Sequence, residues 1–456
     1  MWWLLAGVGL VVGLGCGAGD AAPLPSALAA AEQRLAPRFA SRGVAYPPRA
    51  VALLALKREA RLELWADGGS GWTFVRSYLI RAASGSLGPK LREGDHQVPE
   101  GVYRIAALHP ASAYHLSLEI DYPNAFDRAR AAEDGRTRLG GSIMIHGGSA
   151  SDGCLPLGDA GVEEVFALVE RVGTDRVDVV VSPLDLRRYG PRLAAVGAGV
   201  RPSWVEGLYE TIARALEPFG LPADDGPAAG RAAAPSTPRC RGYDVADCVR
   251  RCERGDRASC ARAGLMYEGG RGVAADADRA WSLLRRACEG GDAFGCAELG
   301  RLYLADDGPR LNAARALELA EAACAGGDGH GCSDLAQLCT DGVVYAPPGA
   351  CAAERVRGLR EAAVARLRRG CAGWDAYDCT TLAAIYYPGD RPTSLRFAAG
   401  ACDGGDAAGC WTAARVAEDA GDAAGAAASY ARACERGWLA ACERARGGVV
   451  HAVALP

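Results

Sequence analysis

The stretch CEGGDAFGC, Cys288–Cys296, decides how the second half of this chain folds, because it sets two cysteines eight residues apart around a helix break. On one continuous helix such cysteines lie about 12 Å apart along the axis, which no disulfide spans. The Gly-Gly-Asp between them ends one helix and caps the next, so that the two sulfurs can meet across an antiparallel turn. The spacing therefore predicts a helical hairpin closed by a disulfide.

The same spacing recurs along the chain. Seven cysteine pairs stand eight residues apart, at 240/248, 252/260, 288/296, 324/332, 371/379, 402/410 and 434/442. Cys339 and Cys351 make a wider pair, so Cys16 and Cys154 alone remain of the 18 cysteines. We expect disulfides; buried free thiols or a metal site are the alternative, which the lack of any C-x-x-C disfavours. Cys248 and Cys252 are close enough to leave their local pairing open.

Helical repeats are predicted around these pairs. The step from Cys252 to Cys288 is 36 residues, the next step to Cys324 is again 36, and Ala and Leu recur at helical spacing. A period in this range indicates a helical solenoid over residues 240–445. The stretch 258–303, with AELGRLY on a first helix and GGRGV in a loop, resembles the cysteine-rich variant of Sel1-like repeats. Residues expected in the repeat core are Tyr267, Trp281, Tyr303, His330 and Trp411.

That resemblance implies a scaffold with a concave surface and no chemistry of its own. The functional interpretation is docking of envelope proteins or a glycan strand, and the alternative is a disulfide-stiffened spacer.

The N-terminal half has a different pattern, of short runs rich in β-branched and aromatic residues. Examples are AVALLALK, RLELWA, WTFVRSYLI and RVDVVVSP, separated by turn residues. They predict a mostly antiparallel sheet in a domain over residues 46–200, with one helix at about 161–172 and another from Ser203. The segment 221–239, rich in Pro, Gly and Ala, is predicted to be a linker.

One motif in this half, SIMIHGGSASDGCLPLGD at 142–159, pairs a histidine with a cysteine that no spacing explains as structural. The run SIMI predicts a strand that delivers His146 to a rim, and the following loop has only small or polar side chains before Cys154. A cysteine nucleophile needs a base beside it, which histidine supplies. Gly153 permits close backbone approach, so that nearby amides could form an oxyanion hole. The pair predicts a catalytic dyad.

IHGGSASDGC resembles the active-site motif of YkuD-type L,D-transpeptidases, cysteine enzymes that remodel peptidoglycan. Two earlier blocks resemble the YafK-like branch of that family, and with the motif they span about residues 46–185. The matching positions in the two blocks are Lys90, Glu93, Gly94, Asp95, Pro99, Glu100, Gly101, Tyr114, His115, Tyr122, Pro123, Asn124, Asp127 and Arg128.

The resemblance implies Cys154 as nucleophile and His146 as general base, without cofactor or metal. It implies that the thiolate attacks the carbonyl after an L-centre of a stem peptide, expels D-alanine and passes the acyl group to an amine or to water. Residues that would shape the substrate and oxyanion site are Gly147, Ser151, Gly153, His115 and Arg128. For His115 the alternative is an ordinary strand histidine, and for Asp127 and Arg128 a solvated charge pair. We expect His96 and His109 to be surface residues.

This chain departs from commoner family members just before and after the Gly-Cys dipeptide. They carry histidine and arginine where this chain has Asp152 and the Leu155-Pro156 run. The acceptor therefore stays open, and two other functions remain: a hydrolase, as amidase or endopeptidase, acting on peptidoglycan or on peptidoglycan-to-lipoprotein links, and an inactive wall-binding adaptor.

The N-terminal segment predicts export. Residues 1–19 carry no charged side chain, and Cys16 follows GLG as at a lipoprotein cleavage site. Lipidation of Cys16, simple secretion and a retained anchor are the three alternatives, and all place the body of the protein in the periplasm or cell envelope, where disulfides persist. A net charge of −4, spread along the chain, gives no support to nucleic-acid binding.

Overall fold

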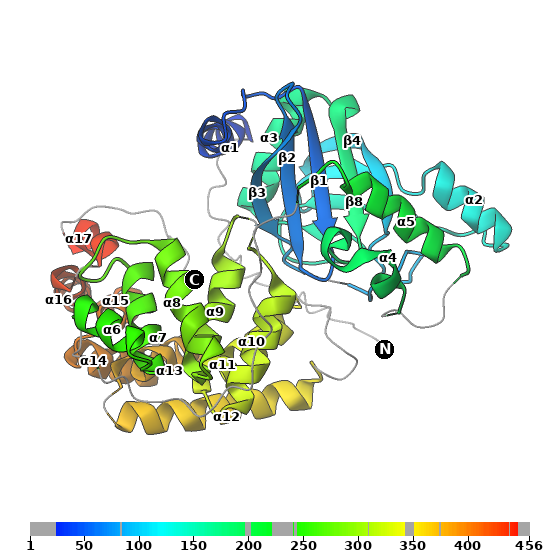
Figure 1. The fold of residues 1–456 in the computed structure, drawn as a ribbon. Helices are drawn as coiled ribbons and strands as arrows, with labels where there is room; N and C mark the ends of the chain where they lie inside the picture. Colours follow the sequence, from blue (N-terminus) through cyan, green and yellow to red (C-terminus); the bar gives the residue numbers. More distant parts are fainter. Residues whose placement is uncertain are drawn as a thin grey trace, which may run out of the picture.

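The computed structural model describes residues 24–82, 84–196, 202–220, 240, 244–308, 310–342, 351–373, 375–436 and 438–445. A half built on a β-sheet lies beside an all-helical half (Figure 1). The expected leader with Cys16 and the expected linker 221–239 lie outside the described residues. Within the described ranges, no helix combines the length and the apolar composition needed to cross a bilayer.

The sheet has eight strands in the order β3-β2-β1-β8-β4-β5-β6-β7. The pairs β1–β8 and β6–β7 are parallel and the remaining pairs are antiparallel, so the predicted mostly antiparallel sheet is confirmed. The strands are β1 Ala50–Leu56, β2 Arg61–Asp67, β3 Trp72–Leu79, β4 Gly101–Ser112, β5 His115–Ile120, β6 Met144–His146, β7 Leu155–Pro156 and β8 Val177–Ser182.

Helices cover both faces of the sheet. Alternate side chains of β1 point to opposite faces, so neighbouring residues of this strand enter different cores. Leu53 belongs to the core that includes α1 (Leu24–Ser41) and α3 (Asp159–Val172). Leu54 belongs to the core on the other face, which includes α5 (Val205–Leu216). Helices on both sides of the predicted 46–200 range therefore also pack on the sheet. Two further helices are α2 (Ala125–Glu133) and α4 (Leu186–Val196).

The described residues of the second half form helices only, as predicted. They are α6 Val245–Glu253, α7 Arg257–Glu268, α8 Ala277–Glu289, α9 Ala293–Ala305, α10 Ala313–Ala325, α11 Gly329–Asp341, α12 Ala353–Ala372, α13 Ala376–Tyr386, α14 Arg391–Asp403, α15 Ala407–Asp419, α16 Ala423–Glu435 and α17 Leu439–Ala445. Consecutive helices pack against each other, and the odd-numbered helices α7, α9, α11, α13 and α15 also contact their neighbours along the array.

All eight predicted disulfides are present, including Cys240–Cys248 and Cys252–Cys260, whose pairing the sequence left open. The turn between Cys288 and Cys296 shows how the two cysteines meet. Helix α8 ends at Glu289, and Gly291 takes φ 88°. The Asp292 carboxylate then accepts the Gly295 amide at 2.7 Å. The chain reverses within this turn, which brings the two Cα atoms to 4.4 Å. A positive φ is available to glycine without steric cost, which explains why the break carries it.

The two halves join where the loop between α9 and α10 meets the β1–β2 turn and the edge strand β3. The Ser77 amide donates to the Asp307 carbonyl at 2.6 Å, and the Ala313 amide donates to the Glu59 carbonyl at 2.8 Å. The buried Arg61 guanidinium donates to the Leu311 carbonyl at 2.7 Å and pairs with Glu63 at 3.1 Å. Backbone and buried charge therefore hold the repeats against the sheet.

Candidate active site

The parallel pair β6–β7 brings the two residues of the predicted dyad close together in the fold. Ile145 is the register partner of Leu155, and His146 is the partner of Pro156. Ile145 and Leu155 are both buried in the core. Cys154 directly precedes β7, so the register places its backbone one residue pair, Ile145 and Leu155, away from His146.

The imidazole of His146 is buried and held in one orientation. Its Nδ1 lies 2.6 Å from the Gly147 carbonyl oxygen, and its ring packs against Tyr114 with 4.6 Å between centroids. A carbonyl only accepts, so Nδ1 carries the proton and the Nε2 lone pair is available as a base. Burial lowers the pKa of His146, outweighing the opposing hydrogen bond to Gly147, so the ring is neutral at neutral pH.

Cys154 is the one free cysteine among the described residues, and it is half-buried. Burial raises the pKa of its thiol; a backbone hydrogen bond from Met144 opposes the rise, the Asp152 carboxylate adds to it and Lys90 opposes it. The sulfur lies 3.9 Å from the Ser142 carbonyl oxygen, to which the thiol donates. The resting pair is therefore a neutral thiol beside a neutral imidazole.

A chain of hydrogen bonds fixes the loop that carries Cys154. Ser151 Oγ donates to the Cys154 carbonyl at 2.7 Å and lies 2.9 Å from Ser84 Oγ. The Gly153 amide donates to Ser84 Oγ at 2.7 Å. Since each hydroxyl has one proton, Ser84 donates to Ser151, and the bonds run in one direction from Gly153 to the Cys154 carbonyl. No sequence motif pointed to Ser84, which lies 67 residues before Ser151 in the chain.

Gly153 is needed at its position for two reasons. Its φ is 87°, and a Cβ there would meet the Gln97 carbonyl oxygen at 2.9 Å. The start of the same loop is held by Asp159 at the N-terminus of α3, whose carboxylate accepts the Gly148 amide at 2.8 Å. Asp159 is a second residue that the sequence alone did not single out.

The segment that carries Ser84 is itself anchored by a buried ion pair. Lys57 Nζ lies 2.9 Å from Glu100 Oε1 and also donates to the carbonyls of Ser86, Gly88 and Val98. Tyr209 of α5 donates to the other Glu100 oxygen at 2.8 Å. Glu100 lies in one of the blocks singled out from the sequence, and this contact gives it a structural role.

Asp152, at the position where the sequence departs from commoner relatives, has a partner on the protein surface. Its Oδ1 lies 2.5 Å from His96 Nδ1, and both side chains are exposed. His96 is therefore a surface residue as predicted, and it places an imidazole and a carboxylate beside the Cys154 loop.

The predicted oxyanion and substrate residues divide into two groups. Gly147, Ser151 and Gly153 lie in the loop with the dyad, but the amides of Gly147 and Gly153 are already used: Gly147 donates to Tyr114 and Leu116 carbonyls, and Gly153 donates to Ser84. Both amides therefore already have acceptors within the protein. The sequence could not show this, because their acceptors come from other strands and loops.

His115 lies against Gly147, and its ring is paired with α3. His115 Nε2 lies 3.0 Å from Glu163 of α3. Arg128 is exposed on α2, and its described contacts include none with the His146–Cys154 loop. Its neighbour Asp127 accepts the Asn124 amide in a capping box, and burial raises its pKa to about 6. Within the described residues, no three His, Cys, Asp or Glu side chains gather as metal ligands would.

Comparison with known proteins identifies the sheet half. The L,D-transpeptidase catalytic domain family, YkuD, matches residues 50–181. One relative is YafK of Escherichia coli strain K12, which is provisionally named an L,D-transpeptidase. It is 38% identical to this chain over 121 residues, which are 26% of this chain and 47% of YafK. This chain therefore spans about half the length of the curated relatives it matches. Residues 50–181 are a YkuD-type L,D-transpeptidase domain related to YafK.

The helical half is similar to solved repeat proteins. c5321 of uropathogenic Escherichia coli, described as displaying an SLR fold, matches with a TM-score of 0.26 and 21% identity over 44% of each chain. A Sel1 repeat protein from Oxalobacter formigenes matches with a TM-score of 0.26 and 17% identity, over 42% of this chain and 77% of that one. Scores this low carry no argument about function, and the helices and disulfides themselves define the repeat region.

Proposed function

We propose that this protein, whose residues 50–181 form an L,D-transpeptidase domain, transfers acyl groups from peptidoglycan stem peptides through a thioester on Cys154. The observation that carries the proposal is the held imidazole: the Gly147 carbonyl occupies Nδ1 of His146 and leaves Nε2 available as a base, and the register of β6 and β7 brings the free cysteine within one residue pair of His146. In this proposal His146 is the general base and Cys154 is the nucleophile.

In the proposed reaction, His146 Nε2 takes the thiol proton as the sulfur of Cys154 attacks the carbonyl carbon after the L-centre. The tetrahedral intermediate collapses with loss of D-alanine, whose amine leaves with the proton from His146. The resulting thioester is then attacked by the amine of a second stem peptide, which loses its proton to His146, and the free thiol is regenerated. Transfer consumes one peptide bond and forms another, so no cofactor is required.

The resting protonation state gives this reaction a pH requirement. A raised pKa on Cys154 and a lowered pKa on His146 disfavour a preformed ion pair, so proton transfer accompanies attack on the bound substrate. The base must be neutral, and activity is therefore expected to fall as pH drops through the pKa of His146, below its ordinary value.

The oxyanion of the intermediate needs a donor other than Gly147 and Gly153. For the Cys154 amide, the described residues include no hydrogen-bond acceptor. This amide lies at the nucleophile itself, which is where an oxyanion forms. We assign it the oxyanion role, with the Ser84–Ser151 hydrogen bonds holding the two peptide groups that flank it.

Hydrolysis is the second candidate, and the Asp152–His96 pair favours it. A carboxylate and an imidazole 2.5 Å apart beside the Cys154 loop could hold the water that attacks the thioester. The protein would then be an amidase or endopeptidase that cuts peptidoglycan or peptidoglycan-to-lipoprotein links.

The location of the protein follows from its cysteines. Eight disulfides require an oxidising compartment outside the cytoplasm. We propose the periplasm or cell envelope, with a lipid anchor on Cys16 that holds the protein at the membrane. In this arrangement the repeats dock envelope proteins, and the enzyme acts in cell wall biogenesis and cell shape.

The test is incubation of the wild type and Cys154→Ala with muropeptides that carry tetrapeptide stems, followed by mass spectrometry. Crosslinked dimers or exchanged D-amino acids support transfer, whereas loss of a residue without dimers supports hydrolysis. Ser149→Ala is the matched control, because Ser149 is an exposed hydroxyl of the same loop. Identical product traces from the wild type and Cys154→Ala would overturn the proposal.

A further inference from the structure

The repeat array is irregular at α11–α13, and a cavity extends past this step from α7 to α15. Cys324 and Cys371 are 47 residues apart in place of 36, and α12 has 20 residues where α8 and α10 have 13. The cavity has a volume of about 910 Å³ and is lined by residues of the odd-numbered helices α7 to α15. Ligand pockets in proteins occupy about 300–1,000 Å³, so this space suits part of a peptide and exceeds a single ion.

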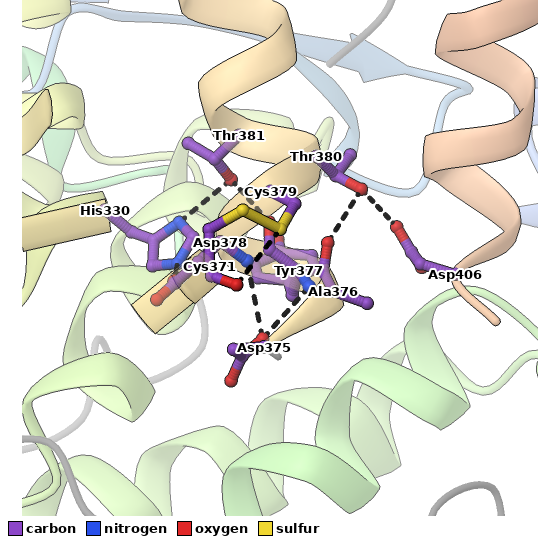
Figure 2. The surroundings of a disulfide bond; sticks show 10 residues. All are labelled: His330, Cys371, Asp375, Ala376, Tyr377, Asp378, Cys379, Thr380, Thr381 and Asp406. Atoms are coloured by element: carbon purple, nitrogen blue, oxygen red, sulfur yellow. Dashed lines mark hydrogen bonds and ion pairs between the residues drawn. A yellow bond between two sulfur atoms is a disulfide. The ribbon is translucent and has the colours of Figure 1, made fainter. Parts of the chain in front are cut away.

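Part of the cavity wall is a set of charges that already have partners. His330 of α11 lies 2.7 Å from Asp378 and 3.1 Å from Thr381, both of α13 (Figure 2). Arg301 of α9 lies 2.9 Å from Glu298. The His330 contacts join α11 to α13, and Arg301 also donates to the Tyr377 hydroxyl of α13 at 2.6 Å, which joins α9 to α13 and holds the wall in place.

Two carboxyl groups in the same cavity lack such partners. The Oδ2 atom of Asp334 is buried, with no hydrogen-bond partner among the described residues. Glu268, at the end of α7, is exposed inside the concave wall and makes no described hydrogen bond or ion pair. Desolvation raises the pKa of both, that of Asp334 to about 7, despite the nearby Arg301. Each carboxylate would be stabilised by a cation that enters the cavity.

The other side of the cavity is aromatic and apolar. The Trp411 and Trp438 rings are stacked with 5.8 Å between centroids, and Ile385 lines the same space. Indole faces attract cations and pack well against aliphatic chains. Two further cations line the wall: Arg271 lies 3.5 Å from Asp406, and Arg436 donates to the Arg432 carbonyl at 3.0 Å.

We propose that this cavity binds a peptide segment that presents an ammonium group on an aliphatic side chain, with the ammonium at Asp334 and Glu268 and the chain against Trp411. An anionic ligand would face two carboxylates that lack described partners, and an apolar ligand would cover both without supplying a hydrogen bond or a charge. The site is separate from Cys154 and needs no catalytic step, so it does not rest on the proposed enzymatic function.

The experiment is isothermal titration of the full chain, made catalytically silent by Cys154→Ala, with the peptide acetyl-Ala-Lys-Ala-amide. The same peptide with an acetylated lysine removes only the charge. Binding of the lysine peptide, with a loss of about tenfold or more on lysine acetylation, is expected, because a charge-assisted hydrogen bond contributes about 1.5–3 kcal/mol.

The matched protein variants are Asp334→Asn and Asp341→Asn, which change a carboxyl in the cavity and one at the end of the same helix outside it. Asp334→Asn is expected to weaken binding about tenfold or more, and Asp341→Asn to leave it unchanged. Thermal unfolding identifies any variant that fails to fold, and Glu268→Gln then replaces it. Absence of binding, equal binding of the acetylated peptide, or equal loss in both variants would overturn the proposal.

Discussion

Substitution of Ser84 by alanine tests whether the hydrogen bonds behind the Cys154 loop matter for its chemistry. The Ser84 hydroxyl accepts the Gly153 amide at 2.7 Å and donates to Ser151 Oγ at 2.9 Å. Its removal leaves the Gly153 amide without that acceptor, which costs about 1–3 kcal/mol. If this free energy destabilises the ordered conformation of the Cys154 loop, the population of that conformation falls about 5- to 150-fold.

The assay compares turnover of muropeptides at saturating substrate by Ser84→Ala and by Ser149→Ala, the exposed hydroxyl of the same loop. Ser84→Ala is expected to lose turnover by the factor above, while iodoacetamide still labels Cys154 and the melting temperature shows a folded chain. Ser149→Ala is expected to act as the wild type. Wild-type turnover by Ser84→Ala, or an equal loss in both variants, would refute this account of the loop.

Two further predictions concern charge. Asp152→Asn removes a carboxylate that raises the pKa of Cys154, so the pH profile of iodoacetamide labelling is expected to move to lower pH; an unmoved profile contradicts that electrostatic assignment. Burial alone would lower the pKa of His330, but its bond to Asp378 and the nearby Asp328 raise it to about 9. The positive charge of His330 therefore stabilises the folded repeats. This stabilisation is complete at pH values below about 6.5, the ordinary pKa of histidine, and is lost as pH rises toward 9. Urea unfolding of the wild type and His330→Gln should differ most below that window, and a pH-independent difference would refute the assignment.

The fold was predictable where local signals and burial agree. The Gly-Gly-Asp breaks between cysteines carry both the helix stop and the cap, and the disulfides follow from them. The runs AVALLALK and RVDVVVSP became β1 and β8, but their parallel pairing joins residues more than 100 positions apart and leaves no local trace. The two-residue strand β7, with a proline in it, was too short to be predicted.

The candidate site was predictable in its residues and less so in its contacts. His146 and Cys154 stand close in sequence and carry the chemistry themselves. Ser84 and Asp159 act through position, because ordinary polar residues gain a role only when the sheet brings them to the loop. The acceptors of the Gly147 and Gly153 amides could not be predicted, because these acceptors lie on other strands and loops.

The central claim is a thioester on Cys154, and intact-protein mass spectrometry tests it most directly. The wild-type chain, mixed with a tetrapeptide-stem muropeptide and quenched in acid within one turnover, is expected to gain the mass of the substrate minus D-alanine. Peptide mapping should place this mass on Cys154, and Cys154→Ala should show no addition. An unmodified wild-type protein that has nevertheless released D-alanine, or the same addition on Cys154→Ala, would contradict the account.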